Sequence, residues 1–146
     1  MDFIFDTHAH YNDKAFNEDR TTLLDSFTES GILGVINCGT DIEESKNSIA
    51  LSKEYDFMYC AVGFHPEEIH KVNENYLTEI KELSRHKKCV AIGEIGLDYY
   101  RKDGDMQKIK VNAIHPSIGI LKSSNRIANV QIIPIIHNRM VVARVI

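Results

Sequence analysis

Two histidines that follow the first apolar run are the residues whose type and spacing point most directly to a chemical function. His8 and His10 follow the run Phe-Ile-Phe-Asp at residues 3–6. On a β-strand, residues two apart project from the same face, so their imidazoles lie side by side. Neutral imidazole is a common ligand of Zn²⁺ and its neighbours, which makes the pair a candidate metal site with Asp6 as a supporting carboxylate. The alternative is a pair of solvated or core histidines.

Three more polar residues follow apolar runs in the same way. Glu94 comes after Cys-Val-Ala-Ile-Gly, and a carboxylate at the end of a buried strand is costly unless it is paired or bound to a metal. It is either a metal ligand or a salt-bridged glutamate. His65 and His137 also end apolar runs. His65 is a candidate substrate contact or ligand, with an ordinary loop residue as the alternative.

The elements that must position these side chains alternate along the chain. Apolar runs near 32–37, 57–62, 89–93 and 132–136 predict buried strands, and amphipathic patterns predict helices at 17–30, 40–55 and 76–86. Gly31 suits the residue after the first helix, and Thr40 with Glu43 fits a capping box with Thr40 as the N-cap. Alternating strands and helices indicate an α/β fold with a parallel sheet. In such folds the carboxyl ends of the strands carry the site.

Composition excludes several classes of protein. The net charge of −4 argues against a nucleic-acid-binding protein that uses a basic surface, but it leaves room for an enzyme that holds phosphates through metal. The three cysteines are an odd number without CxxC spacing, so we expect small core residues rather than a disulfide or a zinc site. No apolar run has the ~18 residues of a membrane span and the start lacks a signal-peptide pattern, so we expect a cytoplasmic protein without a membrane partner.

Charge is distributed unevenly along the chain. Residues 106–146 contain six basic residues and no acidic one, whereas all 21 acidic residues precede them. Pro116 and Gly119 interrupt any helix in this part. We therefore expect residues 106–146 to be divergent, and a frameshift near residue 105 is the simplest hypothesis.

Three motifs resemble signatures of the TatD-type metal-dependent hydrolases, a family of deoxyribonucleases. They are Phe-Asp-Thr-His-Ala-His at 5–10, Gly-Phe-His-Pro at 63–66 and Ala-Ile-Gly-Glu-Ile-Gly-Leu-Asp-Tyr-Tyr at 91–100. The third is long and specific, and it argues against a PHP-type phosphoesterase, another class of enzyme that opens with two such histidines. The resemblance covers residues 1–105 well. Ile-Ile-His-Asn-Arg at 135–139 is a weaker match to the family's next strand end.

The resemblance implies a TIM-type (β/α)₈ barrel with two divalent ions at its mouth, Mg²⁺, Zn²⁺ or Mn²⁺. His8 and His10 would bind the first ion, Glu94 would bridge both, His137 would bind the second, and His65 would lie near the substrate phosphate. The implied reaction is hydrolysis of the phosphodiester bonds of DNA by water that the two ions activate.

The sequence also departs from the family pattern. Met140 stands where an aspartate normally follows the arginine, and a full barrel needs ~250 residues. We therefore expect one incomplete barrel domain over residues 1–146, truncated after about five of eight strands. The family's catalytic aspartate has no position here, so the catalytic residue is unknown. The alternative function is a catalytically inactive fragment or a non-catalytic interaction module, and an open sheet edge would favour self-association.

Overall fold

The computed structural model describes residues 3–96, 131–136 and 139–140. The described strands are β1 (Ile4–Ala9), β2 (Ile32–Cys38), β3 (Met58–Val62), β4 (Cys89–Gly96), β5 (Gln131–Ile136) and β6 (Arg139–Met140). The α-helices are α1 (Arg20–Asp25), α2 (Ile42–Glu54) and α3 (Tyr76–Leu83), and the short 3₁₀ helices are η1 (Lys14–Phe16) and η2 (Pro66–Lys71).

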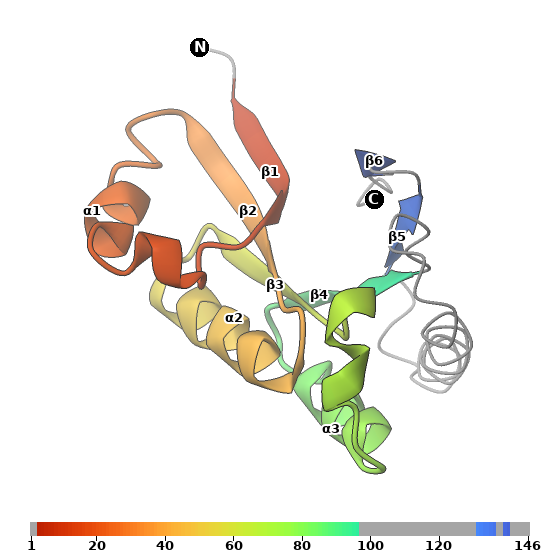
Figure 1. The fold of residues 1–146 in the computed structure, drawn as a ribbon. Coiled ribbons are helices and arrows are strands. Elements are labelled where there is room, and N and C mark those ends of the chain that lie inside the picture. Colours follow the sequence, from red (N-terminus) through yellow and green to blue (C-terminus); the bar gives the residue numbers. More distant parts are fainter. Residues whose placement is uncertain (1–2, 97–130, 137–138, 141–146) are drawn as a thin grey trace.

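These strands form a single sheet in chain order. The order is β1-β2-β3-β4-β5-β6, with β1 to β5 parallel and β6 antiparallel to β5. Figure 1 shows the sheet curling from β1 to β4 with α1, α2 and α3 on one side of it. The predicted α/β fold, in which parallel strands alternate with helices as in part of a TIM-type barrel, is confirmed.

Helices cover the sheet through two clusters of apolar side chains. Ile49 of α2 and Ile80 of α3 pack against Cys60 and Val62 of β3 and Ile92 of β4. The second cluster joins α1 and the residues that follow it in the chain to β2 and β3. Its buried members are Ala9, Leu24, Phe27, Val35 and Met58. Burial of the larger of these side chains, each worth about 1.5–3 kcal/mol when complete, fixes the helices on the sheet and so aligns the strand ends.

A third cluster consists of alternate residues of the same strands. It contains Ile36, Cys38, Ala61 and Ala91. Because successive side chains of a strand point to opposite faces, this cluster lies on the face away from α2. Cys38 and Cys60 are buried, Cys89 is half-buried, and all three thiols are free, as expected from the sequence.

Strand β1 forms one edge of the described sheet and exposes apolar side chains. Ile4 and Phe5 of β1, Phe3 directly before it and Leu33 of the neighbouring β2 are all about half exposed or more. An exposed apolar edge of this kind was expected from an open sheet. Self-association through this edge stays a prediction. Among the described residues, no helix has the length and apolar character needed to cross a membrane.

Two local predictions were wrong: the extent of the first helix and the N-cap of the helix α2. The helix expected over 17–30 is confined to Arg20–Asp25 and ends at Ser26, whose hydroxyl donates 2.7 Å to the carbonyl oxygen of Leu23. A side chain that bonds to the backbone in this way competes with the helical hydrogen bonds. Gly31 does adopt the left-handed conformation, with φ of 81°, and lets the chain enter β2.

The N-cap of α2 is Asp41 rather than Thr40. Its side chain accepts a hydrogen bond of 2.8 Å from the backbone amide of Glu44. It also forms an ion pair of 2.7 Å with Lys71 at the end of η2. The carboxylate satisfies a free amide at the start of the helix and is itself neutralised, which explains why it displaces the threonine. This pair ties η2 to α2 on the side of the sheet where the strands end.

Candidate metal centre

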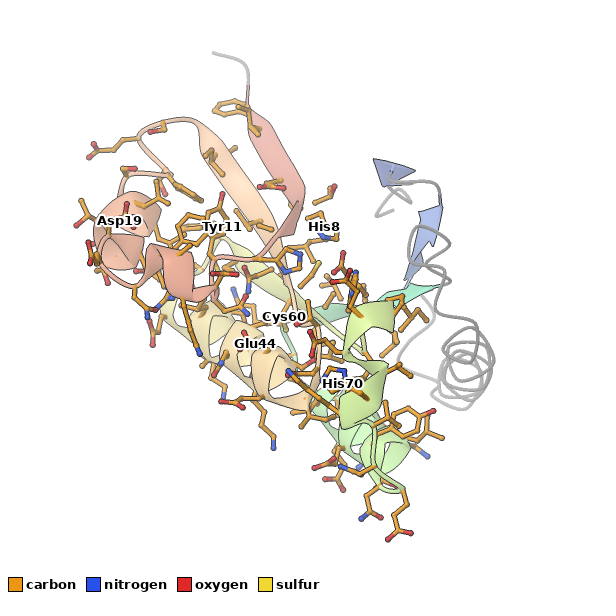
Figure 2. The ribbon with its side chains drawn as sticks, in the orientation of Figure 1. His8, Tyr11, Asp19, Glu44, Cys60 and His70 are labelled. Carbon is orange, nitrogen blue, oxygen red and sulfur yellow. The ribbon has the colours of Figure 1, made fainter. Side chains whose placement is uncertain are left out.

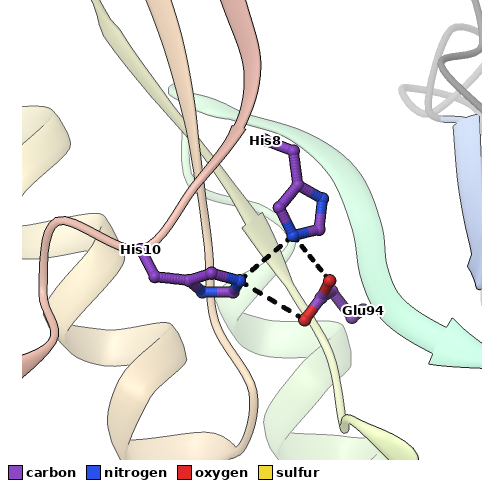
Figure 3. A group of neighbouring side chains, drawn as sticks. All are labelled: His8, His10 and Glu94. Carbon is purple, nitrogen blue, oxygen red and sulfur yellow. Dashed lines mark hydrogen bonds and ion pairs between the residues drawn. The ribbon is translucent and has the colours of Figure 1, made fainter. Parts of the chain in front are cut away.

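The carboxyl ends of β1 and β4 bring His8, His10 and Glu94 together (Figure 3). His8 lies inside β1, whereas His10 lies one residue beyond its end at Ala9. Glu94 lies in β4, and its backbone amide donates 3.3 Å to the carbonyl oxygen of Gly39, just behind β2. The parallel register therefore places residues 8, 10 and 94 at one edge of the sheet, as the sequence predicted.

Their donor atoms form a compact triangle. His8 Nε2 lies 2.6 Å from Glu94 Oε1 and 3.0 Å from His10 Nε2, and His10 Nε2 lies 3.6 Å from Glu94 Oε2. Two ligands of one tetrahedral ion with bonds of ~2.0–2.2 Å lie about 3.3 Å apart. The two histidine nitrogens and the contact of His10 with Glu94 are near this separation, whereas His8 and Glu94 are closer, at the distance of a hydrogen bond. One ligand atom from each of the three residues lies within 4.8 Å of the others, so the group could hold one ion. Within the described residues this is the one group of three or more potential ligand side chains in such proximity.

Hydrogen bonding prepares His10 for this role. Its Nδ1 lies 3.0 Å from the carbonyl oxygen of Cys38, which can only accept, so Nδ1 carries the proton. The Nε2 atom then has a free lone pair directed at His8 and Glu94. A histidine whose second nitrogen donates to a backbone carbonyl is the usual arrangement around a bound metal.

His8 fits the same role with a change of tautomer. A carboxylate oxygen can only accept, so His8 Nε2 donates to Glu94 Oε1 at 2.6 Å, and that proton would have to leave before an ion binds. His8 Nδ1 is buried and has no hydrogen-bond partner among the described residues. The donor set of two imidazoles and one carboxylate suits Zn²⁺, Mn²⁺ and related ions.

Glu94 is buried and charged at neutral pH. It is 6 % exposed. Burial by itself raises the pKa of Glu94, but the hydrogen bond from His8 and the fields of His8, His10 and His65 outweigh it and hold the pKa below its ordinary value. A buried carboxylate that faces three imidazoles is the environment that favours a bound cation.

His65 lines a pocket beside this triangle. The pocket has a volume of about 440 Å³, and His10, His65, Lys71 and Glu94 contribute to its wall. His65 Nδ1 accepts 3.1 Å from the amide of Glu67, so the ring carries its proton on Nε2 when neutral. His65 therefore offers a donor next to the candidate ligands, as a substrate contact requires.

The other predicted residues are placed differently. His137 lies outside the described residues, although the strand expected before it is present as β5. Asp6 Oδ1 accepts 3.0 Å from the backbone amide of His8 and does not hold the imidazole. The expectation that the Asp6 carboxylate supports a histidine ring is therefore wrong. The backbone carbonyl of Cys38 holds the ring of His10 instead, and the residue types in a sequence do not reveal which backbone carbonyl will act as an acceptor.

Comparison with known proteins identifies the family of this chain. The sequence model of the family described as TatD related DNase matches residues 5–145. The chain is 35% identical over 137 residues to the uncharacterized metal-dependent hydrolase YabD of Bacillus subtilis, with 93% of this chain and 51% of the relative covered. It is 31% identical over 99 residues to the 3'-5' ssDNA/RNA exonuclease TatD of Edwardsiella piscicida, with 67% of this chain and 38% of the relative covered.

Solved structures of similar proteins share the fold. The crystal structure of YjjV, a TatD homolog from Escherichia coli, has a TM-score of 0.74 at 27% identity and covers 82% of this chain and 46% of that one. A TatD family hydrolase from Entamoeba histolytica has a TM-score of 0.72 at 25% identity, with 84% and 48% covered.

The chain spans about half the length of the relatives it matches. The boundary at residue 105 and the frameshift stay predictions. The family match over 5–145 and the strand-end histidines and glutamate lead to one conclusion: the chain belongs to the TatD-related DNase family of metal-dependent hydrolases.

Proposed function

We propose that this chain binds divalent metal through His8, His10 and Glu94 and uses it to hydrolyse phosphodiester bonds of single-stranded DNA. The observation that carries the proposal is the triangle of donor atoms, with the proton of His10 held on Nδ1 by Cys38. The relative from Edwardsiella piscicida is named a 3'-5' ssDNA/RNA exonuclease, which supports the choice of substrate.

Each residue has a defined part in this proposal. His8, His10 and Glu94 would hold the divalent metal, and His137 would be a further ligand. Bound divalent ions supply Lewis-acid activation of water and neutralise charge on the phosphate. His65, with its Nε2–H next to the pocket, donates to a phosphate oxygen and orients the substrate.

Charge in the pocket explains why metal is central to substrate binding. Its wall has two lysines, Lys14 and Lys71, against six acidic residues, which are Asp13, Asp41, Glu44, Glu67, Glu68 and Glu94. Lys71 is paired at 2.7 Å with both Asp41 and Glu68. A phosphate would be repelled by this wall, so bound cations must provide the attraction.

A cleavage assay tests the proposal. The purified chain is incubated with 5′-labelled single-stranded DNA and Mn²⁺, Mg²⁺ or Zn²⁺, alongside the Glu94→Gln variant and a sample with EDTA. We expect cleavage that requires metal and is lost in the variant. Cleavage that persists with EDTA would refute the metal mechanism. No cleavage, with metal bound weakly or not at all, would instead support the alternative, a catalytically inactive fragment or a non-catalytic interaction module.

A further inference from the structure

His10 is the least confined of the three candidate ligands. Its side chain is 36% exposed, compared with 11% for His8 and 8% for Glu94. The last residue of β1 in register with β2 is Ala9, opposite Asn37, so the ladder ends before His10. The direction of its ring therefore depends on the loop at residues 11–13 as well as on the contact with Cys38.

Asn37 binds this loop from inside the fold. It is fully buried, and its Oδ1 accepts 2.6 Å from the amide of Tyr11. Its Nδ2 donates to Asn12 Oδ1 at 2.5 Å and to Ser48 Oγ at 2.9 Å. One buried amide thus joins the end of β2, the loop and helix α2. Asn12 also donates to Glu44 of α2 (Figure 2 labels Tyr11 and Glu44).

Arg20 holds the same loop from the other side. Its Nε donates a hydrogen bond of 2.6 Å to the carbonyl oxygen of Tyr11. Its Nη2 donates hydrogen bonds of 3.3 and 2.9 Å to the carbonyl oxygens of Asn12 and Asp13. The guanidinium group is planar and presents several donors in fixed directions, so it can hold three successive carbonyl groups at once. Main-chain groups on both sides of residue 12 are therefore fixed.

We propose that Asn37 and Arg20 are positioning residues of the metal centre, which hold the loop at 11–13 so that His10 Nε2 faces His8 and Glu94. The inference rests on the proposed metal function of these three residues. Metal ligands must be held to within fractions of an ångström, and loss of supporting contacts typically weakens metal binding about 10- to 100-fold. Neither residue contacts substrate or metal in this account.

The test compares metal affinity in variants and matched controls by isothermal titration calorimetry with Mn²⁺ and Zn²⁺. Arg20→Lys keeps the charge and removes the planar group, and because Arg20 is half-exposed this variant should fold normally. Asn37→Ala removes all three contacts of the buried amide. As controls, Arg85→Lys makes the same exchange at an exposed arginine that follows α3, and Ser52→Ala removes a buried hydroxyl that donates to Ile49 instead of the loop. We expect about tenfold weaker binding in the first two variants and unchanged binding in the controls.

A second readout does not need metal. The ¹⁵N chemical shifts of the His10 ring, measured without metal at a pH where the ring is neutral, should show a single Nδ1–H tautomer in the wild-type chain and a mixture in Arg20→Lys and Asn37→Ala. Equal affinities and an unchanged tautomer in both variants would overturn the inference. If the wild-type chain binds no ion, the proposed function fails, and the tautomer alone decides whether Asn37 and Arg20 position His10.

Discussion

The Nδ1 atom of His10 lies 3.0 Å from the carbonyl oxygen of Cys38. This contact joins the residue that follows β1 in the chain to the last residue of β2. It orients the lone pair of His10 Nε2 toward His8 and Glu94. The acceptor belongs to the backbone, so the contribution of Cys38 to the metal centre does not depend on its thiol. Burial, together with the nearby charge of Glu94, raises the pKa of the thiol well above its ordinary value and keeps it protonated.

Replacing Cys38 with alanine should therefore separate stability from metal binding. The side chain is fully buried against Ile36, Ala61 and Ala91, so its loss leaves a small cavity and lowers the free energy of unfolding by about 1 kcal/mol. Metal affinity should stay within about twofold of wild type because the carbonyl remains. Urea unfolding and calorimetry measure the two quantities. A stable variant that has lost metal binding would contradict the role of the carbonyl.

Gly63 should tolerate no side chain. An added Cβ would lie 2.6 Å from the backbone carbon and oxygen of Gly93, directly before Glu94. Gly63→Ala must push β3 and β4 apart, and we expect a loss of about 1–3 kcal/mol in unfolding free energy together with weaker metal binding.

Gly34→Ala is the matched control for this substitution. The three atoms nearest to its added Cβ belong to the ring of Phe5, a side chain that is 48% exposed and can shift more easily than backbone. We expect near-normal stability and metal affinity in this variant, measured by urea unfolding and calorimetry. Equal damage from both substitutions would count against a specific backbone approach at the site.

Asp41 should make the stability of the chain depend on pH. Burial alone raises its pKa, but the amide of Glu44 and the ammonium group of Lys71 outweigh this and lower the pKa below its ordinary value. A lowered folded pKa means that the stabilisation is present above the unfolded pKa of about 3.9 and is lost as pH falls through the folded pKa.

Two substitutions separate the contributions of Asp41. Asp41→Ala should cost about 0.5–2 kcal/mol at neutral pH through loss of the N-cap. Asp41→Asn keeps a capping oxygen and should cost less. Urea unfolding at neutral pH and near pH 3 gives both values. The difference between wild type and Asp41→Asn should shrink in acid; a constant difference would refute the proposed origin.

The sequence predicted the parallel arrangement and the residues that meet at the strand ends, because both follow from local patterns. Apolar runs mark the strands, and the parallel order places their last residues at one edge. His8, His10 and Glu94 were found in this way. Gly31 was expected directly after the first helix, but that helix ends at Asp25, so only its left-handed conformation agrees with the expectation.

The supporting contacts could not be predicted because they join residues far apart in the chain. The bonds of Asn37 to Asn12 and Ser48 depend on how α2 packs against β2. Asp41 replaced Thr40 as N-cap because Lys71, 30 residues later, pairs with it. No local pattern indicates such a partner, and His137 lies outside the described residues.

The most direct test of the account is equilibrium metal binding to the wild-type chain and to two glutamate variants. Glu94→Gln removes a proposed ligand, whereas Glu68→Gln removes a carboxylate from the same pocket wall that pairs with Lys71 instead. We expect saturable binding of Mn²⁺ or Zn²⁺ that falls at least about 100-fold in Glu94→Gln and stays unchanged in Glu68→Gln. Equal binding by all three proteins, or none by the wild-type chain, would contradict a metal centre built from His8, His10 and Glu94.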